Sequence, residues 1–200
     1  MPAPSPPAST VPLPSRPLLT ADTAASLLAA HQQGAQHWHG SLDLGRSQGQ
    51  ALLEDGCWHW QGHRYPYPQR CRERTVYWFD GQDWTPVSRY AGSLIKLVPT
   101  EWGVPTFEID GIKMLPTSKQ SPLEDARRKV ALVQAQGQAV LDTCGGLGYF
   151  AACCLDAGAA SIDSFEKNES VLWLRTLNPW SPDLGPRSLS RAVSTEDSLE

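Results

Sequence analysis

The chain has 200 residues, a formal net charge of −4 and a hydrophobic fraction of 40%, which suits one full globular domain or two small ones. It contains no apolar run of about 18 residues or more, so the sequence predicts no membrane-spanning helix. The first residues lack the basic and apolar regions of a signal peptide, and a cytoplasmic location is therefore expected. The acidic balance disfavours a dedicated nucleic-acid-binding protein.

The cysteines do not indicate a disulfide framework or a metal site. There are five, an odd number, and Cys153 and Cys154 are sequence neighbours, so reduced thiols are expected. Zinc-binding residue types occur in the first half of the chain, at Cys57, His59, His63 and Cys71. Their spacing matches no common structural zinc pattern, and the sequence therefore predicts no metal site.

The first half of the chain predicts a β-rich domain. Residues 1–17 are dominated by Pro, Ser and Ala and are predicted to be a disordered tail. Within residues 18–119, a helix is expected over Leu18–Gln33, capped by Thr20 or Asp22. Short alternating stretches from about Ser41 to Met114 predict an antiparallel sheet with mostly buried tryptophans. Type I′ hairpin turns are expected at Asp80-Gly81 and Asp110-Gly111.

Residues 120–200 predict a change to alternating strands and helices. Ser121, followed by Pro122 and Glu124, predicts the start of a helix, in which Leu123, Ala126, Val130 and Val133 repeat at helical spacing. The predicted elements that follow are a strand (Ala139–Asp142), a helix (Tyr149–Ala157), a strand (Ser161–Glu166), a helix (Glu169–Leu177) and a further strand near Leu189–Val193. This βαβα order indicates a parallel sheet. The predicted fold is thus an α+β, β-rich N-terminal domain followed by a partial α/β, Rossmann-like segment.

One motif points to a nucleoside cofactor. Gly146 and Gly148 lie between a buried strand and the start of a helix, where glycine lets a ligand approach the backbone and free amides act as donors. Glu166 ends the next strand, where a carboxylate can accept both ribose hydroxyls. The glycines alone fit either NAD or S-adenosylmethionine (SAM). Asp142, an acid directly before the turn, favours SAM.

The segment VLDTCGGLGYFAACCLDAGA, followed by SFEKNESVLWLRTLNPWS, resembles the first half of class I SAM-dependent methyltransferases. It is similar to a group of predicted archaeal and bacterial methyltransferases over roughly Pro105 to Asp183. The resemblance implies SAM as cofactor, bound by Asp142, Gly146, Gly148 and Glu166, with Thr143, Cys144 and Leu147 as adjacent turn positions. Cys144 stands where many of these enzymes have a glycine. The sequence does not identify the methyl acceptor.

Two alternatives remain. The β-rich domain followed by a helix and a glycine turn is also similar to spermidine synthases, which are aminopropyltransferases, although Met114 stands where those enzymes commonly have glutamine. A non-catalytic binding module with a vestigial nucleotide fold is the other.

Only about 80 residues follow Gln120, fewer than such a cofactor domain usually needs. We therefore expect an incomplete domain that binds SAM weakly or not measurably and does not turn over.

Overall fold

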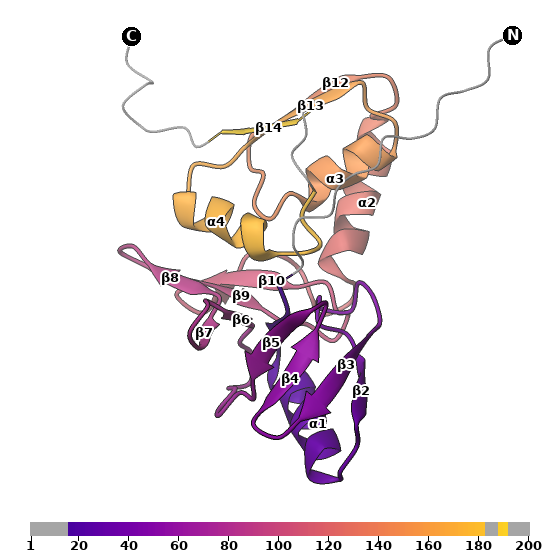
Figure 1. The fold of residues 1–200 in the computed structure, drawn as a ribbon. Helices are drawn as coiled ribbons and strands as arrows, with labels where there is room; N and C mark the ends of the chain where they lie inside the picture. The colour runs from indigo at the N-terminus through magenta and orange to yellow at the C-terminus, as the bar shows by residue number, and fades with distance from the viewer. Residues whose placement is uncertain (1–15, 183–187, 192–200) are drawn as a thin grey trace, which may run out of the picture.

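The computed structural model describes residues 16–182 and 188–191, which form a mixed α/β protein with several antiparallel sheets and one small parallel sheet. Figure 1 shows the first half of the chain at the bottom of the view and the second half at the top. Most of the predicted tail, residues 1–15, lies outside the described residues. No helix in the described part of the chain is both long and apolar enough to cross a membrane.

The first helix begins later than the sequence predicts. Leu18–Leu19 form strand β1, which pairs with a later strand, and helix α1 spans Ala21–Gln32. Thr20 is the N-cap, and its hydroxyl accepts a hydrogen bond from the amide of Thr23 at 3.2 Å. Leu18 and Leu19 are both buried, so pairing and burial with distant residues outweigh a local preference for extending the helix.

The strands that were predicted to form one antiparallel sheet belong to three separate sheets. The first has the order β2-β3-β4-β5, with β2 His37–Gly40, β3 Gly49–Glu54, β4 Cys57–Trp60 and β5 His63–Pro66. The second has the order β1-β6-β7, with β6 Tyr77–Phe79 and β7 Trp84–Pro86. The third has the order β11-β10-β9-β8, with β8 Ser88–Tyr90, β9 Leu94–Val98, β10 Thr106–Ile109 and β11 Ile112–Lys113. The alternation that predicts strands does not specify which strands pair.

One of the two predicted type I′ turns is confirmed. Asp110 and Gly111 have φ values of 49° and 83° between the paired strands β10 and β11. The Asp80-Gly81 prediction was wrong, because only Gly81 has a positive φ and β6 and β7 are joined by the four residues 80–83. The Asp80 carboxylate instead accepts hydrogen bonds from the amides of Gln82 and Asp83, which favours a longer loop.

The prediction of buried tryptophans holds for most of the rings in the β-rich half. Trp38, Trp58, Trp60 and Trp84 are buried in one hydrophobic core between the sheets and α1. Trp78 is partly buried, and Trp102 is 43% exposed. Trp58 stacks on Tyr65 with a centroid separation of 4.8 Å, so this core is built on large rings.

The second half of the chain forms the parallel sheet and its helices. They are α2 Pro122–Val133, β12 Ala139–Asp142, α3 Tyr149–Asp156, β13 Ser161–Phe165, α4 Glu169–Leu177 and β14 Ser188–Arg191. The sheet order is β12-β13-β14, with both pairs parallel. The predicted end of the last strand, at Val193, lies outside the described residues. Val133 was predicted on the apolar face of its helix but is 53% exposed, because α2 ends there.

One hydrophobic core crosses the boundary predicted at residue 119. It includes Leu97 and Phe107 from the β-rich half together with Leu147 and Ile162 from the α/β half. Helix α4 packs against β9. The elements of the first half therefore form part of the support for the turn after β12.

Candidate cofactor site

The two parts of the predicted cofactor motif meet at one edge of the parallel sheet. β12 and β13 are adjacent and parallel, as predicted, with Asp142 opposite Ser164. The glycine turn follows β12 directly, and Glu166 is the first residue after β13. Because both strands end at the same edge, the turn and Glu166 lie at the carboxyl edge of the sheet, where open α/β folds bind ligands.

The glycines of the turn are required for two different reasons, backbone conformation and lack of space. Gly146 and Gly148 have φ values of 48° and 83°, in the left-handed region that favours glycine, and Gly148 is the N-cap of α3. Gly145 has an ordinary conformation but no room for a side chain, because a Cβ would collide with the Arg175 guanidinium and the Ser164 hydroxyl. The Gly145 amide also donates a hydrogen bond to the Phe165 carbonyl at 2.7 Å. Gly145 was not among the predicted site residues, although it stands within the glycine run.

Glu166 contacts the turn directly. One carboxylate oxygen accepts a hydrogen bond from the Gly146 amide at 3.0 Å, and the other accepts one from the Asn168 amide at 2.9 Å. The side chain is half-buried. An ionised carboxylate offers about four lone-pair positions, so two bonded oxygens still leave acceptor capacity for ligand hydroxyls.

Asp142 contacts both the start of the turn and the neighbouring strand β13. It is 8% exposed, accepts a hydrogen bond from the Ser164 hydroxyl at 2.9 Å, and accepts another from the Cys144 amide at 3.3 Å. The carboxylate therefore joins β12 to β13 and fixes the first peptide of the turn. Its negative charge therefore lies next to the backbone at the start of the turn.

A buried arginine that was not among the predicted site residues contacts the turn. Arg175 on α4 is 5% exposed; its Nε donates to the Gly146 carbonyl at 2.5 Å and its Nη2 to the Ser164 hydroxyl at 3.2 Å. Burial lowers the pKa of Arg175, and the charges of Asp142 and Glu166 oppose that shift. Arg175 lies four residues after the buried Val171, so its place on the apolar face of the helix was a usable sequence signal.

The other predicted turn residues differ in exposure. Thr143 and Cys144 are exposed, whereas Leu147 is 1% exposed and packs in the core. Only the backbone of Leu147 can therefore border a ligand. The Leu147 carbonyl accepts a hydrogen bond from the Ser181 hydroxyl at 2.7 Å.

A buried chain of hydrogen bonds links the turn region to the β-rich half. The Tyr149 hydroxyl, in the first turn of α3, donates to the Pro105 carbonyl at 2.8 Å and accepts from the Asn178 amide group at 2.9 Å. Asn178 also donates to the Ser181 hydroxyl. Burial raises the pKa of Tyr149 strongly.

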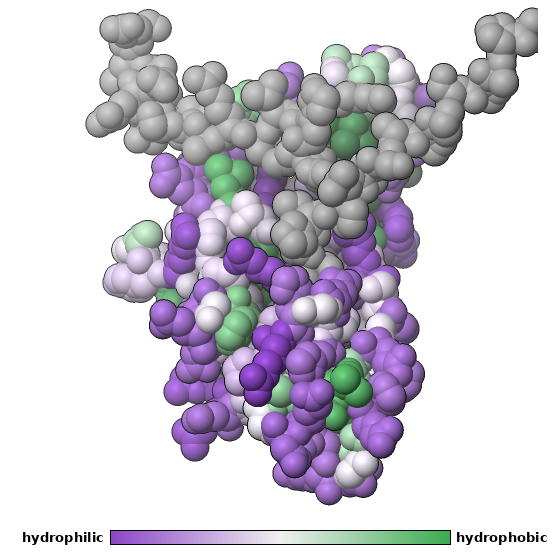
Figure 2. Space-filling view, in the orientation of Figure 1, coloured by the Kyte–Doolittle hydropathy of each residue, from purple (hydrophilic) through white to green (hydrophobic). Residues whose placement is uncertain are grey.

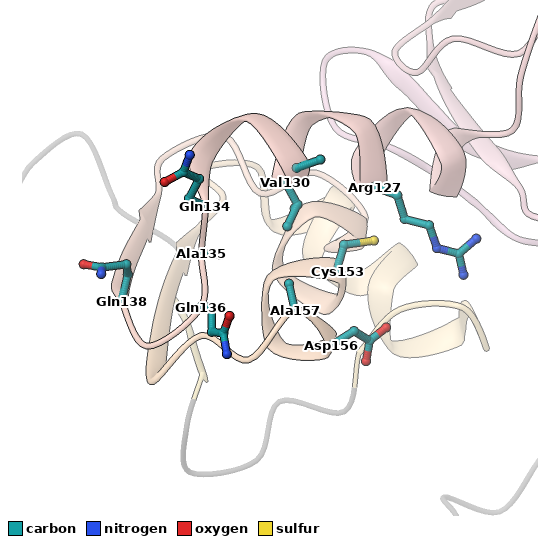
Figure 3. A pocket seen from close by; sticks show the side chains of 10 residues that line it. Arg127, Val130, Gln134, Ala135, Gln136, Gln138, Cys153, Asp156 and Ala157 are labelled. Carbon is teal, nitrogen blue, oxygen red and sulfur yellow. The ribbon is translucent and has the colours of Figure 1, made fainter.

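A cavity of about 710 Å³ lies elsewhere, between α2 and α3 (Figure 3). Its lining includes Arg127, Gln134, Gln138, Cys153 and Asp156. Gln138 directly precedes β12, so this cavity borders the amino edge of the strand. It is therefore separate from the glycine turn at the carboxyl edge.

No protein-family model matches the chain. An uncharacterized protein of Methanocaldococcus jannaschii is 47% identical over 90 residues, which are 44% of this chain and 30% of that protein. The chain thus spans less than a third of this relative. Two solved structures are similar to parts of it, both at 15% sequence identity. A proposed RNA methyltransferase from Pyrococcus horikoshii has a TM-score of 0.29 and covers 38% of this chain and 40% of its own. A proposed SAM-dependent methyltransferase from Streptococcus mutans has a TM-score of 0.36 and covers 61% of this chain and 30% of its own.

Proposed function

We propose that this chain binds S-adenosylmethionine at the turn between β12 and α3 and belongs to a methyltransferase. The observation that carries the proposal is the contact between Glu166 and the Gly146 amide. This contact places a carboxylate, of the kind that binds ribose hydroxyls, next to a glycine turn that begins a helix. Both lie at the carboxyl edge of a parallel sheet.

In this proposal each group has a separate role. Glu166 accepts hydrogen bonds from the ribose hydroxyls, while the turn around Gly146 lets the rest of the nucleoside approach the backbone. Asp142 and Arg175 position that turn from the protein side, through the Cys144 amide and the Gly146 carbonyl. SAM supplies an electrophilic methyl group, and a methyltransferase accelerates its transfer chiefly by holding donor and acceptor in line in a dry pocket.

The charges around the turn favour SAM over a dinucleotide. Asp142 and Glu166 place two carboxylates beside the turn, and Arg175 lies on the side of the turn that faces the protein. The positive charge of a sulfonium nucleoside is favoured by such carboxylates. An acid at the position of Glu166 also binds the ribose of NAD, so the preference for SAM rests on Asp142. This electrostatic preference supports the sequence argument based on Asp142.

Calorimetry on the purified 200-residue chain tests the proposal, with SAM, S-adenosylhomocysteine and NAD⁺ as ligands. We expect weak binding of the two adenosyl ligands for two reasons. Among the described residues β12 pairs only with β13, which leaves one edge of the sheet unpaired, and Leu141 is 65% exposed, so one face of β12 is open to water. Glu166→Ala should weaken SAM binding by about tenfold or more, which corresponds to about 1.4 kcal/mol.

Glu169→Ala is the matched control, because it removes an exposed carboxylate at the start of α4. SAM affinity should be unchanged in this variant. Preferential binding of NAD⁺, equal SAM affinity in Glu166→Ala and the wild type, or no SAM binding at all would overturn the proposal.

A further inference from the structure

Three side chains of metal-binding type meet on the outer face of the β3–β4 hairpin, far from the glycine turn. Glu54 ends β3 and Cys57 begins β4, and these two residues are paired across the hairpin. His59 lies two residues further along β4, on the same face as Cys57. The neighbours Leu53 and Trp58 point the other way, into the core.

The potential ligand atoms form a compact triangle. The Cys57 sulfur lies 3.8 Å from Nε2 of His59 and 3.8 Å from Oε2 of Glu54, and these last two atoms are 2.9 Å apart. A tetrahedral zinc ion has Zn–S distances of about 2.3 Å and Zn–N or Zn–O distances of about 2.0 Å. Ligand atoms around such an ion are therefore separated by about 3.3–3.6 Å. Shifts of a few tenths of an ångström would fit the triangle around zinc.

The same triangle argues against a Cys-His-Glu catalytic triad. In a triad the imidazole uses one nitrogen for the nucleophile and the other for the acid. Here the sulfur and the carboxylate both approach the same nitrogen, Nε2 of His59. Three ligand atoms converging on one point is the arrangement that a metal ion requires.

We propose that Glu54, Cys57 and His59 bind a zinc ion whose fourth position is open to solvent. The mixed sulfur, nitrogen and oxygen set suits zinc rather than magnesium or calcium, which prefer oxygen ligands alone. Cys57 is 3% exposed, whereas the side chains of His59 and Glu54 are 34% and 52% exposed, so the open position faces water. Figure 2 shows mainly hydrophilic residues over this lower part of the molecule.

Two neighbouring side chains lie next to the proposed zinc-binding residues. The Tyr67 hydroxyl donates a hydrogen bond to the Glu54 carbonyl at 3.2 Å, which anchors the hairpin end. Arg64, paired with His59 on β5, lies near Cys57. Its guanidinium is exposed, so solvent screens its charge and it can turn away from a bound cation.

The cluster differs from the zinc-type residues noted in the sequence. Of those four, only Cys57 and His59 belong to the triangle, and His63 and Cys71 do not. Glu54 was absent from that set, although it lies only three residues before Cys57 and pairs with it across the turn between β3 and β4.

Titration of the full chain with zinc chloride and cobalt(II) chloride tests the site. We expect one equivalent of either metal to bind, and cobalt to give the intense near-ultraviolet absorption of a thiolate–cobalt bond. Cys57→Ser should abolish that absorption, and Glu54→Gln and His59→Gln should each lower zinc affinity by about tenfold or more. Glu54 is exposed, so its variant tests the site without disturbing the core.

His37→Gln and Cys71→Ser are the matched controls. His37 lies on the same outer face, paired with Leu52, which is in turn paired with His59. Both control variants should bind zinc as the wild type does, and circular dichroism checks that every variant is folded. The proposal is overturned by a folded wild-type chain that binds no zinc, by thiolate–cobalt absorption that persists in Cys57→Ser, or by equal losses of affinity in His37→Gln and His59→Gln.

Discussion

The carboxylate of Glu166 accepts a hydrogen bond from the backbone amide of Gly146 at 3.0 Å, although the two residues are 20 positions apart. Arg175 holds the carbonyl of the same glycine. Both backbone groups of Gly146 are therefore bound by side chains of opposite charge, which come from the end of β13 and from α4. The conformation of the turn depends on these two contacts.

Removal of the Glu166 carboxylate should loosen the turn before any ligand is added. Glu166→Ala leaves the Gly146 amide without its acceptor, and we expect amide hydrogen exchange at Gly146 to accelerate by about tenfold, since a hydrogen bond to a charged group contributes roughly 1.5 kcal/mol. Glu166→Gln keeps a side-chain oxygen and should exchange nearly as the wild type does. Exchange resolved by NMR measures this, and equal rates in the wild type and Glu166→Ala would contradict it.

Gly145→Ala should destabilise the protein by about 2–3 kcal/mol, because the added methyl group overlaps Arg175 and Ser164 and lies 3.1 Å from the Phe165 carbonyl. Gly137→Ala is the comparison, since Gly137 has a φ of 71° but open space around it. Its cost should be limited to backbone strain, about 1 kcal/mol. Urea unfolding gives both values. A Gly145→Ala variant no less stable than Gly137→Ala would show that the turn can move away from α4.

The helices and strands around the site could be predicted where the sequence pattern that specifies them is local. Ser121 does cap α2, accepting a hydrogen bond from the Glu124 amide at 3.0 Å, and the βαβ order did predict the parallel pairing of β12 with β13. Contacts between distant segments were not predictable in this way. Leu18–Leu19 form a strand because β6 is there to pair with them, which no local pattern indicates.

The same distinction applies to the site residues. Glu166 and the glycines carry a motif with a fixed order, so the sequence could place them together. Arg175 was missed because a single arginine on a helix is usually at the surface. Its spacing from Val171 was a signal of burial, but its partners come from the packing of α4 against the turn. Glu54 was missed for a different reason: it pairs with Cys57 across a short hairpin turn, three residues away, and this spacing belongs to no common zinc pattern.

Arg175→Ala should cost about 2–4 kcal/mol of unfolding free energy. It removes a donor from the Gly146 carbonyl and from the Ser164 hydroxyl, and it removes the positive charge that interacts with Asp142 and Glu166. Arg128→Ala serves as control, because the Arg128 side chain is 67% exposed and forms only a surface ion pair with Glu124. That change should stay within about 0.5 kcal/mol. Similar losses in both variants would argue against a structural role for Arg175.

Tyr149 should make the protein sensitive to alkaline pH. Its hydroxyl donates to the Pro105 carbonyl, so the ionised form would face that oxygen without a proton, and burial further disfavours the charge. The folded-state pKa is thus raised above that of the unfolded chain, about 10. Above this pH the unfolded chain loses a proton that the folded protein retains, and the free energy of unfolding falls as the pH rises.

Tyr149→Phe separates the two effects of this hydroxyl. At about pH 7 the variant should be less stable than the wild type by about 1–2 kcal/mol, because Pro105 and Asn178 lose a hydrogen-bond partner. Between about pH 9 and pH 11 the variant should lose less stability than the wild type, since it has no hydroxyl to ionise at this position. Tyr90→Phe removes a hydroxyl from a residue that is 77% exposed. Its free energy of unfolding should match that of the wild type at about pH 7 and across the alkaline range. Urea unfolding across this pH range measures all three proteins, and an alkaline loss in Tyr149→Phe equal to that of the wild type would show that Tyr149 is not the group responsible.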